Sequence, residues 1–382
     1  MAYHQYQPYG GQNPEGQSGY GQQASNGGYQ PQGGYSSYNP SQGGPQYGYP
    51  SGGYYYPRQP QEPYANERLA EKKQIKTRSI VHGLSLLGFS ILGVFLSILL
   101  RDTIPNFRFL YKNNPIFQTA IECLFSIVVI FVPFFCAYFY LKHKQMLRAM
   151  PLGMPKQPTG AVLLVFVGLA ACMAGSYASG LFNTLLENLF HLEFILPQDD
   201  LRLNSVPLAV FTVLKVAVIP ALVEEFAIRG VVMQSLRRYG DGFAILMSAM
   251  VFALMHGNMV QIPFAFIAGI AIGYAVIVTD SMWTGIAIHF LNNLVAVSLQ
   301  IVEDNANIDV QNLVAGIVLL CIFTVGIVCA VLYFTKFNQK KLSKGKSYLR
   351  SGERAKTYVL TVPMILAIIY LLFETAQYVK FR

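Results

Sequence analysis

Residues 206–236 read VPLAVFTVLKVAVIPALVEEFAIRGVVMQSL, and this stretch decides the fold. It is long and apolar enough to cross a bilayer as one α-helix, since a span needs about 20 residues. Within it stand Glu224, Glu225 and Arg229. Ionisable side chains are costly in lipid and persist mainly where they face a protein interior or a water-filled cavity. The stretch therefore predicts a membrane helix that carries a polar site.

Similar apolar segments recur along the chain. Of its 382 residues 53% are hydrophobic and only 12% are charged, whereas soluble domains carry about 25% charged residues. The fifth and sixth segments are short and close together, so the sequence predicts an all-α polytopic membrane helical bundle of 8–9 transmembrane helices. The candidate spans are 80–100, 116–141, 161–190, 206–236, 242–259, 263–279, 283–301, 311–335 and 357–378.

The N-terminal region has a different composition. Residues 1–65 contain no Leu, Ile, Val, Phe or Trp, so they cannot bury enough apolar surface to offset their chain entropy. We expect a disordered Gly/Gln/Tyr/Pro-rich tail that is either a plain tether or a site of weak multivalent protein contacts. A basic juxtamembrane segment (66–79) follows, and then a transmembrane domain (80–382) whose core is expected at about 205–300.

The charges of the loops predict the orientation. Basic residues cluster at 72–78, 142–156, 237–238 and 336–346, in alternate loops, while the loops after the third and seventh spans are acidic. Only the loop after the first span, 101–112, departs from this pattern. The positive-inside rule places the N-terminus in the cytosol. The net charge of +9 therefore reflects topology, and no nucleic-acid partner is expected.

Helical spacing separates the two glutamates. Glu225 and Arg229 are i,i+4 neighbours that can pair on one face, which is a structural role. Glu224 points about 100° away and has no such partner in its own helix. Desolvation disfavours the charged form of a carboxylate, and this makes Glu224 the candidate general base.

A second helix brings a histidine to Glu224. The polar segment around Gly240 predicts a turn, and Glu224 and His256 each lie 16 residues from that glycine. In an antiparallel hairpin both residues would lie about 24 Å from the turn, at matching depth. Phe252, one turn before His256, is expected to pack against the site.

His289 and Asn293 form a third polar pair at i,i+4 spacing. Counting from the preceding turn places His289 several ångströms shallower than Glu224, so tilt or a deeper hairpin is needed to bring them together. Asn292 is offset by about 60° from the His289 face and is a weaker candidate than Asn293. Four other charges in the apolar segments receive low weight, since they lie near span ends or loops or, as with Lys215, can snorkel. They are Glu122, Glu187, Glu374 and Lys215.

At these residues the chain resembles the CPBP family (CAAX proteases and bacteriocin-processing enzymes, also called the Abi family) of intramembrane endopeptidases. Glu224, Glu225 and Arg229 fit the EExxxR motif of the family, and residues 252–256 fit FxxxH. His289 and Asn293 fit HxxxN. The resemblance covers roughly residues 205–300, and it departs from the usual pattern at Ile228, where an aromatic residue is common.

The resemblance implies hydrolysis of a peptide bond in a membrane-associated substrate, either prenylated (CaaX-type) or bacteriocin-like. Glu224 with His256 would activate a water, and His289 with Asn293 would stabilise the oxyanion. Two mechanisms stay open: one without a cofactor, and one in which Glu224, His256 and His289 hold zinc. The expected location is the bilayer of a bacterial cell membrane.

Two other functions fit the same sequence. A non-catalytic immunity or scaffold protein of this fold would also keep the helices, although the intact motif set argues against it. A proton-coupled transporter would use paired carboxylates and histidines as a relay. No internal repeat supports a transporter, although Pro220 is expected to bend the fourth span.

Overall fold

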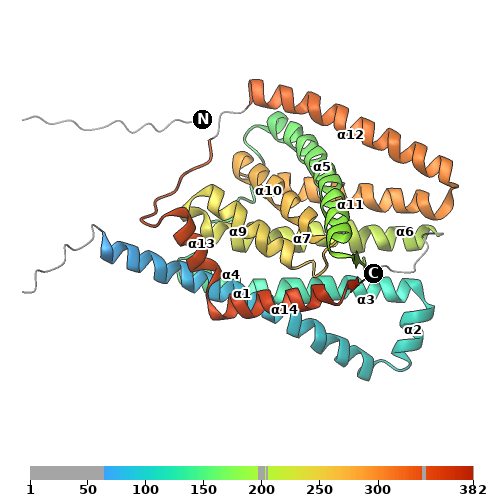
Figure 1. Ribbon diagram of the computed structural model, residues 1–382, viewed down its shortest axis with the longest axis horizontal. Coiled ribbons are helices and arrows are strands. Elements are labelled where there is room, and N and C mark those ends of the chain that lie inside the picture. Colours follow the sequence, from blue (N-terminus) through green and yellow to red (C-terminus); the bar gives the residue numbers. More distant parts are fainter. Residues whose placement is uncertain (1–63, 197–202, 204, 338–340, 382) are drawn as a thin grey trace, which may run out of the picture. The chain divides into compact units, whose positions relative to one another are not determined.

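The structure, a computed structural model, describes residues 64–196, 203, 205–337 and 341–381. The tail expected at 1–65 lies outside this part, except for its last two residues. The described chain is an all-α bundle with one small sheet (Figure 1). Its first half contains α1 (Ala65–Thr103), α2 (Phe107–Asn113), α3 (Pro115–Phe125), the π-helix η1 (Ser126–Ile130), α4 (Phe131–His143), α5 (Pro158–Phe190) and β1 (Leu192–Phe194).

The second half carries the three polar motifs and begins with one interrupted helix, 206–239. This helix consists of α6 (Val206–Val213), the π-helix η2 (Leu214–Val218), α7 (Ile219–Glu225), the π-helix η3 (Phe226–Met233), α8 (Gln234–Leu236) and the 3-10 helix η4 (Arg237–Tyr239). After it come α9 (Asp241–Leu254), α10 (Ile262–Thr279), α11 (Met282–Asn305), α12 (Ile308–Lys336), α13 (Ser351–Val359), α14 (Val362–Ala376) and β2 (Val379–Phe381).

The number of membrane spans is seven or eight, against the eight or nine expected. Within the described residues, seven helices are long and apolar enough to cross a membrane, and the pair α13/α14, bent by 74°, would be an eighth. The nine-span alternative is wrong because the segment 242–259 is not a full span. Its helix α9 has 14 residues, which rise only about 21 Å. Gly257 follows with φ of 61°, a conformation that glycine adopts without strain and that takes the chain into a turn.

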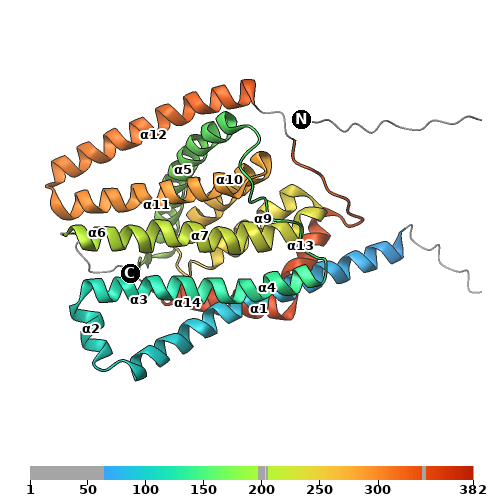
Figure 2. The same ribbon diagram turned by 180° about the vertical axis from the view of Figure 1, so that it is seen from behind.

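The helices pack in two groups around the interrupted helix. α1 packs against α4 and α14, and Figure 2 shows α1 and α4 side by side from behind. α5 packs against α10, α11 and α12, while α9 lies between α10 and η3. The largest buried apolar cluster is centred on residues of η3, α9 and α10, such as Ile228, Phe252 and Ile272. The polar motifs therefore lie in the best-packed part of the molecule.

The sequence did not predict the sheet. β1 and β2 pair antiparallel, with Leu192 opposite Phe381 and Phe194 opposite Val379. Each strand has three residues, so the sheet joins the end of α5 to the C-terminal segment and contributes little to the bundle.

Candidate active site

One cavity of about 360 Å³ brings the polar motifs together. Its walls include Glu224 from α7, His256 from the turn after α9, and His289 and Asn293 from α11. These residues come from separate segments of the chain. The other walls are mainly apolar side chains from α5 and α10, among them Met173, Phe264, Ala268 and Ile272. The cavity thus combines a polar wall with an apolar one.

Glu225 and Arg229 form the predicted ion pair beneath this cavity. The Arg229 Nη1 lies 2.9 Å from the Glu225 Oε1, and both side chains are fully buried. Arg229 Nη2 also donates to the Gly269 carbonyl at 3.3 Å, and its guanidinium lies 4.7 Å from the centre of the Phe252 ring. Such contacts suit a packing role, because they join η3 to α9 and α10 and place no Arg229 atom against the cavity wall.

His289 lies between the two glutamates. Its Nδ1 is 2.9 Å from the Glu225 Oε1, and since a carboxylate only accepts, this nitrogen carries the hydrogen. Its Nε2 lies 3.8 Å from the Glu224 Oε2. The depth difference that counting from the turns predicted is therefore absent. Glu225 orients the ring, and Glu224 faces the other nitrogen.

A close helix contact lets His289 reach this depth. Gly285, one turn before His289, lies against α10, where an added Cβ would be 2.5 Å from the Val276 Cγ2. The same Cβ would be 3.2 Å from the Glu225 Oε2. Only a residue without a side chain lets α11 approach α10 so closely.

This contact gives a first prediction. We expect Gly285→Ala to push α11 away from α10, because the branched Val276 side chain has little freedom to move. The expected result is a lower melting temperature and a loss of any His289-dependent activity. The measurement is thermal unfolding of the purified protein, with Gly316→Ala as the control, since a Cβ at Gly316 meets nothing within 4 Å. Equal melting temperatures of the two variants would contradict it.

The spacing predicted that His256 lies inside a helix, but it lies just beyond the end of one. α9 ends at Leu254, and His256 lies in the turn that leads to α10. Its Nδ1 donates to the Phe252 carbonyl at 2.9 Å, and its ring meets the Phe252 ring edge-on at 4.9 Å. In the neutral imidazole this leaves Nε2 as an acceptor. Phe252 therefore packs against the histidine, and its carbonyl also fixes the tautomer.

Asn293 is held by a backbone carbonyl of the interrupted helix. Its Nδ2 donates to the Val216 carbonyl at 2.8 Å, and its Oδ1 accepts from Asn292 Nδ2 at 3.0 Å. Pro220 has no N–H, so the Val216 carbonyl four residues earlier lacks its usual α-helical partner. One N–H of the Asn293 amide remains for a ligand.

The cavity also includes polar residues to which the sequence gave little or no weight. Asn292 lines it, and within the described part of the chain its buried Oδ1 has no hydrogen-bond partner. Gln261 lines it from the turn before α10, where its side chain accepts from Asn258 at 2.7 Å. Gln261 stands beside an apolar run, and this is the only signal the sequence offered for it.

The residues do not fit a three-ligand metal site in this geometry. Across the described residues, no group of three His, Cys, Asp or Glu side chains is placed to hold one metal ion. In particular, Glu224, His256 and His289 line one cavity without converging as a ligand set.

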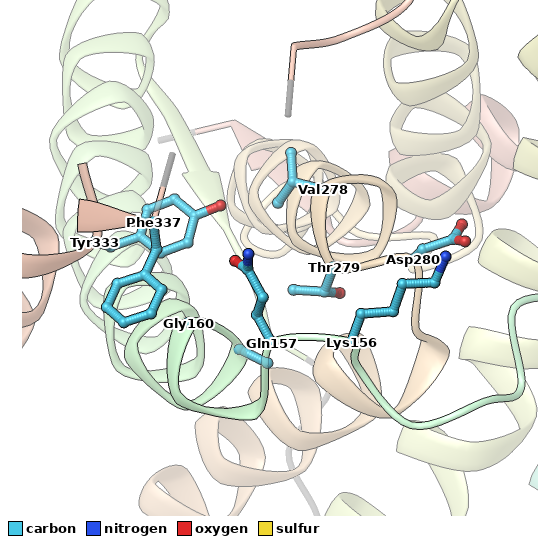
Figure 3. Close-up of a pocket in the computed structure, with 9 residues that line it drawn as sticks. Lys156, Gln157, Gly160, Val278, Thr279, Asp280, Tyr333 and Phe337 are labelled. Atoms are coloured by element: carbon cyan, nitrogen blue, oxygen red, sulfur yellow. The ribbon is translucent and has the colours of Figure 1, made fainter. Parts of the chain in front are cut away.

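A second polar cavity, also of about 360 Å³, lies away from the motifs (Figure 3). It is formed where α5 begins and α10 and α12 end, and Figure 3 shows Lys156 beside Asp280, with Tyr333 and Phe337 on the far side. None of the predicted site residues lines it. The chemistry that the motifs can support therefore belongs to the cavity around Glu224.

The fold and this cavity define a polytopic α-helical membrane protein with a carboxylate, imidazole and amide site among its helices. Residues 206–295 match the family described as Type II CAAX prenyl endopeptidase Rce1-like. The matched segment runs from the start of α6 into α11 and contains all three motifs. The match confirms the resemblance to CPBP intramembrane proteases and supports an endopeptidase of the CAAX-protease type. Comparison with curated proteins and with solved structures gave no match.

Proposed function

We propose that the protein is an intramembrane endopeptidase that hydrolyses a peptide bond with a water activated by Glu224 and His256. The observation that carries this proposal is the single cavity in which Glu224 faces His289 at 3.8 Å and shares the wall with His256 and Asn293. A base, a water-orienting group and oxyanion donors are what peptide hydrolysis requires.

In the first step a water lies between the Glu224 carboxylate and the unprotonated Nε2 of His256. Glu224 takes one proton from the water, His256 accepts a hydrogen bond from its other hydrogen, and the oxygen attacks the carbonyl carbon. The carbon–nitrogen bond then breaks, and the protonated Glu224 returns its proton to the leaving amine. The proton taken from water thus ends on the new amino group.

The negative oxygen of the tetrahedral intermediate accepts from His289 and Asn293. Because Nδ1–H of His289 already donates to Glu225, only the doubly protonated ring has an Nε2–H to offer the substrate. Glu225, at the Nδ1 side of the ring, balances that charge in the intermediate, whereas Glu224 does so only before it takes the proton from the water. Asn293 contributes its remaining amide hydrogen.

The substrate class follows from the apolar wall of the cavity and from its place among membrane helices. We propose a membrane-associated peptide, either prenylated at a C-terminal cysteine or bacteriocin-like, that enters from the bilayer. The N-terminus is proposed to lie in the cytosol of a bacterial cell, since the basic loops belong to one end of the helices. In Figure 1 the start of α1 lies at the left, and the acidic turn between α11 and α12 lies at the right.

The test is an assay of the purified full chain on fluorogenic peptides with and without a farnesylated cysteine. We expect cleavage of the lipidated peptide, and we expect it to persist after treatment with a zinc chelator. Loss of cleavage on chelation, restored by added zinc, would replace the cofactor-free mechanism with a metal-dependent one. No cleavage of lipidated, unmodified or bacteriocin-like peptides would favour the non-catalytic scaffold.

A further inference from the structure

A second group of polar residues, partly buried, lies where the interrupted helix contacts α3. Glu122 of α3 and Lys215 of η2 form an ion pair with Nζ and Oε2 2.5 Å apart, and each side chain is 19% exposed. The other Glu122 oxygen accepts from Tyr111 at 2.6 Å and from Gln118 at 3.1 Å. Lys215 therefore points at an oriented carboxylate.

This ion pair adjoins the backbone that holds Asn293. Lys215 immediately precedes Val216, whose carbonyl accepts from Asn293 at 2.8 Å. Both residues belong to the π-helical segment η2, where the backbone departs from α-helical pairing. Single π-turns within α-helices occur often at functional sites. Pro220 removes the competing N–H four residues later.

We propose that Lys215, Glu122 and Pro220 are positioning residues that act on the proposed active site through the Val216 carbonyl. The ion pair anchors η2 to α3, and Pro220 keeps the carbonyl available. The carbonyl then fixes the Asn293 amide so that its Oδ1 faces Asn292 and its free N–H faces the cavity. This inference rests on the proposed function for its effect on catalysis, but the anchoring itself is independent of that function.

Loss of one charge of the Glu122–Lys215 pair is expected to displace η2, which loss of an ordinary packing contact would not do. A partly buried carboxylate and ammonium in apolar surroundings stabilise each other only while both are present, so removal of one charge forces a rearrangement. The residue expected to move is the one on the π-turn, because its backbone departs from α-helical hydrogen bonding. A displacement of the Val216 carbonyl by about 1 Å would misplace Asn293 enough to cost on the order of 10²-fold in rate.

The first experiment measures hydrogen–deuterium exchange of the segment 210–222 in the purified full chain. We expect faster exchange in Lys215→Met and in Glu122→Gln, and exchange near that of the unchanged protein in the charge-exchange variant Glu122→Lys with Lys215→Glu. The control is Lys72→Met, which breaks an ion pair of 2.7 Å with Glu353 that lies between α1 and α13. Unchanged exchange in Lys215→Met would overturn the anchoring, whether or not any substrate is cleaved.

The second experiment is a double-mutant cycle on cleavage. Asn293→Ala alone should lower kcat by about 10²- to 10³-fold, as loss of an oxyanion donor does. Lys215→Met and Pro220→Ala should each lower kcat by roughly 10- to 100-fold with KM nearly unchanged. In the Asn293→Ala background each should cost less than about twofold more, because coupled residues are not additive. If the losses in kcat were additive, the proposal that Lys215 and Pro220 act through Asn293 would be wrong.

Discussion

Replacement of Glu224 by glutamine is expected to lower kcat for peptide cleavage by about 10²- to 10⁴-fold, the contribution of a positioned general base. Glutamine keeps the size and the hydrogen-bonding oxygen but cannot take the proton of the attacking water. The measurement is the initial rate on the farnesylated fluorogenic peptide, together with a binding assay on the same peptide. Binding should survive, since the change removes a base and leaves the cavity walls in place.

The melting temperature separates this effect from misfolding. The Glu224 side chain is 17% exposed and is not part of the fully buried Glu225–Arg229 pair, so Glu224→Gln should unfold at nearly the same temperature as the unchanged protein. Glu187→Gln is the matched control, because it makes the same exchange in α5, away from the cavity. Full cleavage by Glu224→Gln would remove Glu224 from its role and leave the general base unassigned.

Much of the bundle could be predicted from the sequence because lipid imposes a simple rule. A span must be a long apolar helix, and seven of the nine candidate segments correspond to single helices or, at 116–141 and 206–236, to interrupted helices. The segment 242–259 was wrongly predicted as a full span because most of its residues are apolar, whereas the length of its helix α9 is set by Gly257 and the turn around His256. High hydropathy indicates that a segment is buried, but it does not distinguish a membrane span from a short helix buried inside the bundle.

Part of the site could also be predicted, since i,i+4 spacing fixes which side chains share a face. This spacing gave the Glu225–Arg229 pair and separated Glu224 from it. It could not show that His289 contacts Glu225, because that contact depends on how closely α11 approaches α10 at Gly285. Contacts between helices depend on packing distances that no single segment encodes.

The backbone contributions were the least predictable. Pro220 was expected to bend the fourth span, but its chemical effect is to free the Val216 carbonyl for Asn293. Glu122 and Lys215 carried little weight as isolated charges, and their pairing joins segments 93 residues apart in sequence. The role of a charged residue in a membrane helix can be inferred only when its partner is known.

Replacement of Arg229 by methionine is expected to have the largest effect on folding. It removes the cation that faces the fully buried Glu225 carboxylate and leaves the His289 ring as the ion-pair partner of Glu225 among the described residues. Removal of one partner of a buried ion pair costs about 3–5 kcal/mol, because the remaining charge is uncompensated. The expected result is a large fall in melting temperature, measured by thermal unfolding in detergent, with cleavage lost at temperatures where the variant unfolds.

The double variant Glu225→Gln with Arg229→Met tests whether the uncompensated Glu225 charge causes this loss of stability. It removes both charges, and glutamine keeps an oxygen that can accept from His289 Nδ1, so most of the lost stability should return. Arg68→Met, which breaks a partly exposed contact with Glu353, should change the melting temperature little. If Arg229→Met kept the stability of the unchanged protein but lost cleavage, Arg229 would belong to the chemistry of the site, and its assignment as a packing residue would be wrong.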